Sequence, residues 1–162
     1  MGDTRRHHIF TTFIQRRFRD VGSILEIAGG KGKLARKLAN KGYSVIVIDS
    51  RPRFEGKNHK RITFKKATFS ENYNRLDCDL IIGMHPDETT GEIIRYAGKY
   101  RIQYAIVPCC HVGRDSKNIG NYWEWLTKLK KLAKDNGLTT NEFTLRMNGK
   151  NIVLFGKPKR VK

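Results

Sequence analysis

The chain has 162 residues, which is long enough to bury a core without disulfides or a structural metal and fits one domain over residues 1–162. Its 33 Lys and Arg residues against 15 Asp and Glu residues give a formal charge of +18, which predicts a polyanionic partner, RNA in particular. No apolar run approaches the roughly 18 residues of a membrane span, so no membrane partner is expected.

Three cysteines are an odd number and argue against a disulfide framework. This cysteine content suits a reducing compartment inside the cell. We expect the cytoplasm or the nucleus and a monomer or weak oligomer. The mitochondrion is an alternative, because residues 4–19 carry no acid and are rich in Arg, as in a transit peptide. Phe10, Phe13, Ile14 and Phe18 recur at helical spacing there, so we expect a folded basic helix within residues 1–20 instead.

The following elements alternate between strand and helix. Apolar runs typical of buried parallel strands occupy residues 23–27, 44–49, 61–64, 79–83 and 104–107. Apolar residues at helical spacing predict helices over residues 33–41, 87–100 and 118–136. A polar, basic stretch with Pro52 and Gly56 predicts a loop over residues 51–60. This alternation predicts an α/β fold.

The C-terminal part of the chain has a different pattern. Two strand-like runs, residues 141–147 and 150–156, flank the dipeptide Asn148-Gly149. Asn-Gly between two such runs predicts a tight hairpin, because both residues tolerate positive φ. We therefore expect a doubly wound sheet that ends in an antiparallel hairpin.

A glycine-rich turn, LEIAGGKGKL over residues 25–34, joins the first strand of the alternating region to its helix. Such a turn lets backbone N–H groups and the positive end of the helix face a ligand. A triphosphate loop is excluded, because Leu34 stands where a Ser or Thr would have to reach magnesium. A dinucleotide fingerprint stays open, with Gly30 and Gly32 as its first glycines and Ala35 at the last position.

The same turn resembles motif I of the class I S-adenosylmethionine-dependent methyltransferases, an acid followed by three alternate glycines. Glu26 is the acid, Ala28 replaces the first glycine, and Gly30 and Gly32 are the others. Asp49 lies 17 residues beyond Gly32, where the family carries an acid that accepts the ribose hydroxyls of the cofactor.

This resemblance covers nearly the whole chain. It implies a Rossmann-like, doubly wound, mostly parallel seven-stranded sheet with a C-terminal antiparallel hairpin and an extra N-terminal helix. It also implies that the cofactor is S-adenosyl-L-methionine. The residues expected to bind it are Glu26, Ala28, Gly29, Gly30, Gly32, Asp49, Ser50, Gly83 and Met84.

The loops after the fourth and fifth parallel strands are expected to hold the methyl acceptor. His85 is a candidate general base or acceptor-orienting residue, with plain loop packing as the alternative. Asp87 is a second catalytic candidate, with helix capping as its alternative.

Cys109 is the third catalytic candidate. It belongs to Pro108-Cys109-Cys110-His111, which is similar to a segment in a group of methyltransferase-like proteins that includes tRNA 2′-O-methyltransferases. Two interpretations of Cys109 stay open. It packs as a small residue on the floor of the cofactor and acceptor pocket, or it is a nucleophile for C5 methylation of a pyrimidine. Adjacent cysteines ligate one tetrahedral ion poorly, so no metal is expected.

Basic residues gather in several short clusters. Those expected to bind nucleic acid are Arg5, Arg6, Arg16, Arg17, Arg51, Arg53, Lys57, Lys60, Lys159 and Arg160. The leading hypothesis is an S-adenosylmethionine-dependent methyltransferase that acts on rRNA or tRNA. The alternatives are a catalytically silent RNA-binding or ribosome-assembly protein with the same fold and an NAD-dependent oxidoreductase.

Overall fold

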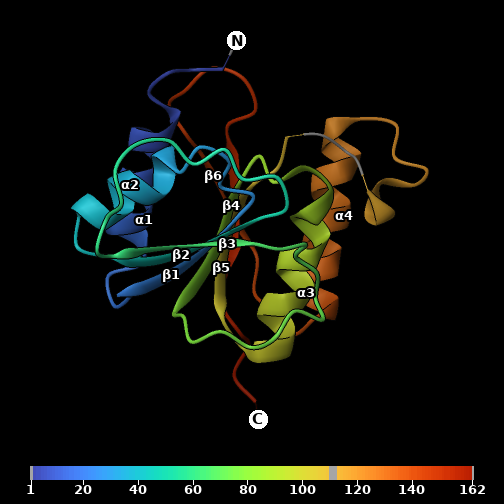
Figure 1. Cartoon of the computed structure of the whole chain (residues 1–162). Helices are drawn as coiled ribbons and strands as arrows, with labels where there is room; N and C mark the ends of the chain where they lie inside the picture. The colour runs from blue at the N-terminus through green and yellow to red at the C-terminus, as the bar shows by residue number, and fades with distance from the viewer. Residues whose placement is uncertain (1, 110–112, 162) are drawn as a thin grey trace.

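A computed structural model describes residues 2–109 and 113–161, and within these ranges seven strands form one sheet. The strands are β1 (Ser23–Ile27), β2 (Ser44–Asp49), β3 (Ile62–Lys66), β4 (Leu80–Met84), β5 (Gln103–Val107), β6 (Asn141–Thr144) and β7 (Ile152–Gly156). Their spatial order is β3-β2-β1-β4-β5-β7-β6 (Figure 1). Strands β1 to β5 pair in parallel, and β7 pairs antiparallel with both β5 and β6. The predicted mostly parallel sheet with an antiparallel end is confirmed.

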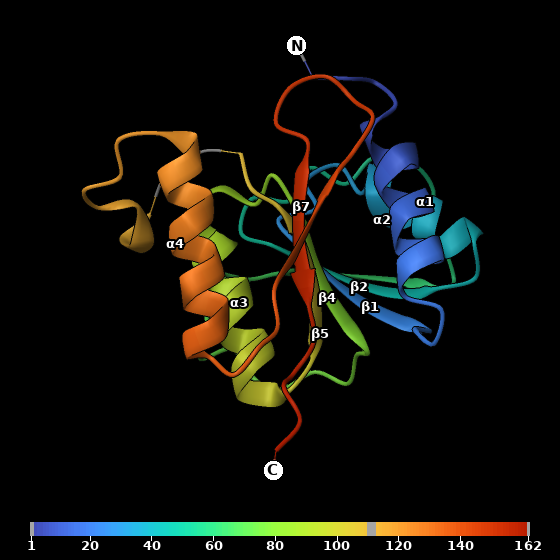
Figure 2. The same cartoon turned by 180° about the vertical axis from the view of Figure 1, so that it is seen from behind.

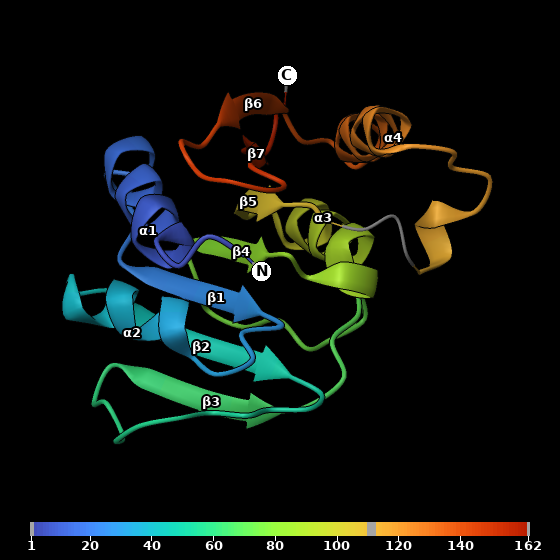
Figure 3. The same ribbon diagram turned by 90° about the horizontal axis from the view of Figure 1, so that it is seen from above.

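Helices cover both faces of this sheet, as expected for a doubly wound fold. They are α1 (Arg6–Arg17), α2 (Lys33–Asn40), α3 (Thr90–Tyr100) and α4 (Tyr122–Asp135). Helices α1 and α2 lie on one face and α3 and α4 on the other, as the view along the sheet in Figure 3 shows. None of the helices within the described ranges has the length and apolar character that a membrane crossing requires.

Two helices begin later than their patterns predicted. Residues 87–89 form a 3₁₀ turn, and α3 follows only at Thr90. Helix α4 begins at Tyr122 rather than at residue 118, because the Asn121 side chain caps it by accepting a hydrogen bond from the Glu124 N–H at 3.0 Å.

The core lies in two layers, one on each face of the sheet. On the first, Phe10 and Ile14 of α1 are fully buried, and the Phe13 ring meets the Phe155 ring edge-on at 5.3 Å. Phe18 is also buried, so the predicted apolar face of the N-terminal helix is confirmed. Figure 2 shows α1 beside the C-terminal strands that it covers.

The C-terminal hairpin does not have the predicted two-residue turn. Residues 145–151 form a longer connection, closed by a 2.8 Å hydrogen bond from the Leu145 N–H to the Asn151 carbonyl. The reason is burial: Leu145 and Met147 both turn into the core instead of continuing a ladder. Gly149 adopts the expected positive φ of 85°, but inside this wider loop.

Candidate functional site

A cavity of about 1180 Å³ lies at the carboxyl ends of the parallel strands. Its walls come from the segments that follow β1, β2, β3 and β4, namely residues 26–31, 48–53, 66–70 and 84–89. Strands β1 and β4 are neighbours in the sheet but not in sequence, so the chain leaves them in opposite directions and a crevice opens between their ends. The fold therefore places the cavity at the usual ligand position of an open α/β sheet.

The glycine turn after β1 forms one wall. A Cβ atom at Gly29 would lie 2.5 Å from Val47 Cγ1 and 3.0 Å from Glu26 Cδ, so no other residue fits there. Gly30 has φ of 53° and lines the cavity, and a Cβ atom there would meet nothing within 4 Å. The turn thus packs tightly on the protein side and leaves its backbone open to a ligand.

Asp49 ends β2, and its carboxylate is fixed by two backbone groups. Oδ2 accepts a hydrogen bond from the Gly30 N–H at 2.8 Å, and Oδ1 accepts one from the Arg51 N–H at 2.7 Å. Each oxygen keeps a further lone pair. Asp49 lines the cavity, so a preorganised pair of acceptor oxygens lies in its wall.

Glu26 is a buried acid at the end of β1, and its Oε2 atom has no hydrogen-bond partner. Burial raises the pKa of Glu26 to about 8; the Ala35 backbone N–H opposes this, and the negative charge of Asp49 adds to it. A buried carboxyl oxygen without a partner is costly unless a cation or a donor reaches it. The cavity wall therefore contains a group that a positively charged ligand would stabilise.

Comparisons with known proteins rest on structure alone. No protein-family model and no curated protein sequence matches the chain. Among solved structures, the sugar N-methyltransferase KedS8 from Streptoalloteichus aligns with a TM-score of 0.67 at 11% identity, over 97% of this chain and 88% of that one. The plantazolicin methyltransferase BpumL in complex with SAH and a triazolic substrate analogue aligns with a TM-score of 0.67 at 14% identity, over 96% and 84%.

The chain has the fold of the class I S-adenosylmethionine-dependent methyltransferases. The methyltransferase SibL aligns over 96% of this chain with a TM-score of 0.64 at 15% identity. Its own chain is longer, and this protein spans 56% of it.

Ala28 occupies the first glycine position of the methyltransferase motif in a left-handed conformation. Its φ is 59°, a region in which a Cβ atom crowds the following carbonyl. Glycine has no Cβ atom and adopts this conformation freely, which explains why glycine is usual at the position. The substitution therefore strains the turn.

Replacing Ala28 by Gly is expected to raise the free energy of unfolding by roughly 0.5–1 kcal/mol, because glycine adopts this φ without the Cβ clash. Urea denaturation measures the change. Ala35→Gly serves as the control, because Ala35 lies inside α2 and glycine there should lower stability by about 1 kcal/mol or more. A loss of stability in both variants would contradict the left-handed conformation of Ala28.

Two histidines from distant parts of the chain line the same cavity. His85 follows β4 with φ of 54°, and His7 comes from the first turn of α1. Burial, Arg6, Lys33 and Lys37 lower the pKa of His7 to about 4. Burial and Arg6 also lower the pKa of His85, against the opposing charge of Asp87. Both imidazoles are therefore neutral near pH 7, and each has one ring nitrogen able to accept a hydrogen bond.

Asp87 and Cys109, the other two catalytic candidates, are in contact. The Cys109 thiol donates a hydrogen bond to Asp87 Oδ1 at 3.0 Å. Asp87 lines the cavity, but Cys109 does not. Asp87 lies in the first turn of the 3₁₀ helix that leads into α3, and Thr89, the N-cap residue of α3, makes no side-chain cap hydrogen bond.

The other residues of the Pro-Cys-Cys-His segment, Cys110 and His111, lie outside the described residues. Within residues 2–109 and 113–161, no three His, Cys, Asp or Glu side chains are placed to hold a metal ion.

The predicted cofactor residues do not all reach the cavity. Glu26, Ala28, Gly29, Gly30, Asp49, Ser50 and Met84 line it. Gly32 instead packs against the Phe64 ring, and Gly83 against Pro86 and Ile93, so both shape the fold around the site. A Cβ atom at Gly83 would lie 2.7 Å from the Ile93 side chain.

The predicted nucleic-acid-binding residues divide between the two ends of the sheet. Arg6, Arg51 and Arg53 line the cavity, and Lys57 lines a groove beside it. Arg5 lies at the N-terminus, where Asp3 binds its guanidinium at 2.8 Å.

The remaining basic residues lie elsewhere. Lys60 precedes the amino end of β3, and Arg16 and Arg17 close α1 before β1 begins. The Lys159 carbonyl accepts a hydrogen bond from Arg101, which precedes the amino end of β5, so Lys159 and Arg160 lie far from the cavity. The structure therefore places only some of the predicted nucleic-acid-binding residues around the cavity.

Sequence reasoning missed several cavity residues. The segment Lys66–Ser70 follows β3, and it escaped notice because that strand was expected to end at residue 64. His7 carried no spacing signal, since only the docking of α1 brings it near His85. The lining residue Glu92 on α3 was missed for the same reason.

Proposed function

We propose that the protein is an S-adenosylmethionine-dependent methyltransferase and that its acceptor is RNA, either rRNA or tRNA. The observation that carries the first part is the buried Glu26 carboxyl, whose Oε2 atom has no hydrogen-bond partner, beside an open glycine turn in a chain with the methyltransferase fold.

The residues of the cavity fit this cofactor. Glu26 would compensate its positive charge, the Gly29-Gly30 backbone would lie against it, and Asp49 would accept its ribose hydroxyls. Lys66–Ser70 and Met84 would complete the walls. When bound, S-adenosylmethionine supplies a methyl group that is already activated for transfer. The chain itself therefore has to align the acceptor and exclude water more than it has to supply acid or base.

His85 and His7 would act on the acceptor. Both are neutral near pH 7, so each offers an unprotonated ring nitrogen that can accept a hydrogen bond from the acceptor. A pKa of about 4 makes His7 a weak base, so His85 is the residue proposed to accept the proton that a hydroxyl or a ring nitrogen loses. The left-handed backbone of His85 and of Asp87 supports a functional loop, because such strain persists where a site requires it.

Charge supports RNA as the acceptor. The formal charge of +18 is far larger than a small neutral acceptor requires. Arg6, Arg51 and Arg53 line the cavity, where a phosphate next to the modified nucleotide would lie. KedS8 and BpumL are named for a sugar and for plantazolicin, so the fold leaves the acceptor open and the cationic lining carries this part of the proposal.

One experiment tests both parts. Calorimetry with S-adenosylmethionine and with NADH is followed by transfer of a tritiated methyl group to total RNA. We expect heat with S-adenosylmethionine alone and labelled RNA, with His85→Ala lowering the labelling but not the heat. Binding of NADH alone would refute the cofactor assignment. RNA binding without labelling would indicate a catalytically silent protein and refute the proposed activity.

A further inference from the structure

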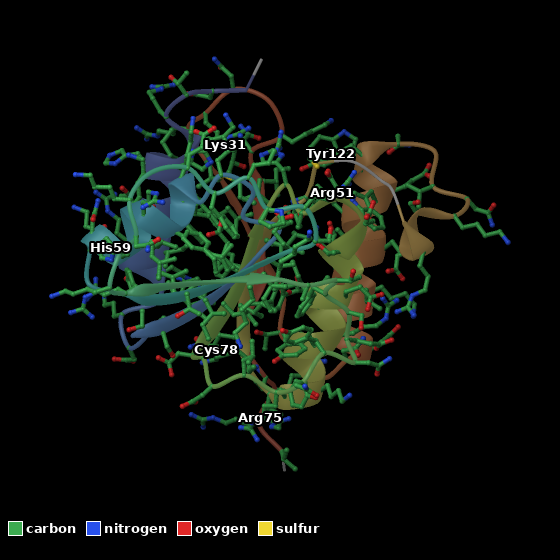
Figure 4. All side chains as sticks on the ribbon, in the orientation of Figure 1. Lys31, Arg51, His59, Arg75, Cys78 and Tyr122 are labelled. Atoms are coloured by element: carbon green, nitrogen blue, oxygen red, sulfur yellow. The ribbon has the colours of Figure 1, made fainter. Side chains whose placement is uncertain are left out.

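A second depression adjoins the cavity and runs along α2. It has a volume of about 460 Å³, and Lys31 and Lys33 line both it and the cavity. We call it the α2 groove; its lining residues are Lys31, Lys33, Arg36, Asn40, Glu55, Gly56, Lys57, Asn58 and His59. Figure 4 shows Lys31 near the cavity end of the sheet and His59 farther along α2. The groove therefore leads from the cavity mouth along the protein surface.

The lining of the α2 groove is cationic and polar. Four of its residues are Lys or Arg, and its single acid, Glu55, already binds Lys31 Nζ at 2.7 Å. Lys33 and Lys57 are exposed, and neither pairs with an acid among the described residues. Among the lining residues there is no aliphatic residue and no Phe, Tyr or Trp. Such a surface suits phosphates more than bases.

Backbone contacts hold the walls of the groove in place. The Arg53 N–H donates to the Gly30 carbonyl and the Glu55 N–H to the Lys31 carbonyl, both at 3.2 Å. The Arg36 guanidinium donates to the Lys57 carbonyl, and Gly56, with φ of 91°, lets that guanidinium lie close. The cations thus sit on a segment that is tied to the glycine turn.

We infer that the α2 groove binds the phosphate backbone of a single RNA strand whose modified nucleotide enters the cavity. The inference rests on the proposed function for the RNA class and adds the path of the strand. A nucleotide has to leave its base stack to enter the cavity, and an unpaired strand allows this without the cost of breaking base pairs. Phosphate contacts position the strand without reading its sequence.

Charge reversal at Lys57 tests the path, because Lys57 lines the groove but not the cavity. Fluorescence anisotropy measures binding of a labelled oligouridylate over a range of salt concentrations. We expect Lys57→Glu to weaken binding about tenfold near 0.1 M salt and to reduce the salt slope by about 0.7, the value for one lost phosphate contact on a single strand. The matched control is Lys159→Glu, which makes the same charge change at the opposite end and should alter affinity less than about twofold.

The outcomes separate this inference from the proposed function. Equal losses in Lys57→Glu and Lys159→Glu, or no loss in either, would overturn the groove assignment, as would groove-dependent binding of duplex RNA alone. Calorimetry with S-adenosylmethionine on the same proteins reports the cofactor site separately. A third outcome is that the wild type fails to bind S-adenosylmethionine while Lys57→Glu alone weakens RNA binding. That combination would refute the proposed activity and support the groove assignment.

Discussion

Replacing Glu26 by Gln is expected to make the ligand-free protein more stable at alkaline pH and to weaken its binding of S-adenosylmethionine. The stability gain follows from burial, which holds the pKa of Glu26 near 8 in the folded protein against 4.5 in the unfolded chain. Between these values the unfolded chain binds fewer protons, so the free energy of unfolding falls as pH rises. The loss approaches about 5 kcal/mol above pH 8, at 1.4 kcal/mol per pKa unit, and Gln avoids it.

Chemical denaturation of both proteins between pH 7 and pH 9 measures this difference. Measurements stay above pH 7 because the lowered pKa of His7 acts in the opposite direction, with stability lost as pH falls from 6.5 toward 4. Glu88→Gln is the control, since Glu88 is exposed on the same cavity and should change stability by less than about 0.5 kcal/mol. Parallel pH curves for Glu26→Gln and the wild type would show that Glu26 is not held neutral.

Cofactor binding supplies the second readout for Glu26. A cationic ligand stabilises the ionised carboxylate, so binding near pH 7 should release a proton from Glu26. Calorimetry in two buffers of different ionisation enthalpy counts that proton. Glu26→Gln should release correspondingly less and bind at least about tenfold more weakly, a loss of about 1.4 kcal/mol. Ionisable groups on the ligand contribute equally to the wild-type and Glu26→Gln measurements. The difference in proton release between the two proteins therefore belongs to Glu26.

Asp49→Asn is expected to reduce affinity for S-adenosylmethionine by at least about 100-fold, or about 3 kcal/mol. Both carboxylate oxygens accept backbone N–H bonds, from Gly30 at 2.8 Å and Arg51 at 2.7 Å. An amide has only one oxygen, so its NH₂ group would face one of these donors. The variant therefore loses the negative charge, one acceptor for a ribose hydroxyl and the fixed geometry of the glycine turn.

The protein contains a matched control for this variant. Asp79 Oδ2 also accepts two backbone hydrogen bonds, from Gly22 at 2.8 Å and Ser23 at 3.0 Å, but at the amino end of β1. Because one oxygen accepts both bonds, an amide oxygen could keep them, so the control is Asp79→Ala, which removes both bonds. It should cost about 1 kcal/mol of stability for each bond lost and leave cofactor affinity unchanged. Calorimetry and urea denaturation of both variants decide the point. Equal losses of cofactor affinity in the two variants would show that the Asp49 variant acts through lower stability rather than through a lost contact with the cofactor.

Some features of the site could be predicted because their signals are local. The glycines of the turn and the acid at the end of β2 lie within one βαβ unit, where strand and helix lengths fix their relative positions. The N-terminal helix was also predictable, because a row of phenylalanines at helical spacing has to be buried.

Other features depended on packing between distant segments. The hairpin connection is longer than the predicted two-residue turn because Leu145 and Met147 are buried in the core. Local turn preferences do not predict that burial. His7 and His85 are separated by most of the sheet in sequence, and only α1 packing brings them to one cavity. The direction of each strand also decided which basic clusters reach the cavity and which lie at the far end with Lys159.

By itself, the sequence determined the order of the elements, the parallel sheet with its antiparallel end and the position of the glycine turn, because hydrophobic period and backbone preference act over a few residues. Only the tertiary structure decided the ionisation of Glu26, the left-handed strain at Ala28 and the division of the positive charge between two ends. Burial, backbone conformation and electrostatic proximity are properties of atoms in space. They arise only when β1, β2 and β4 bring their ends together.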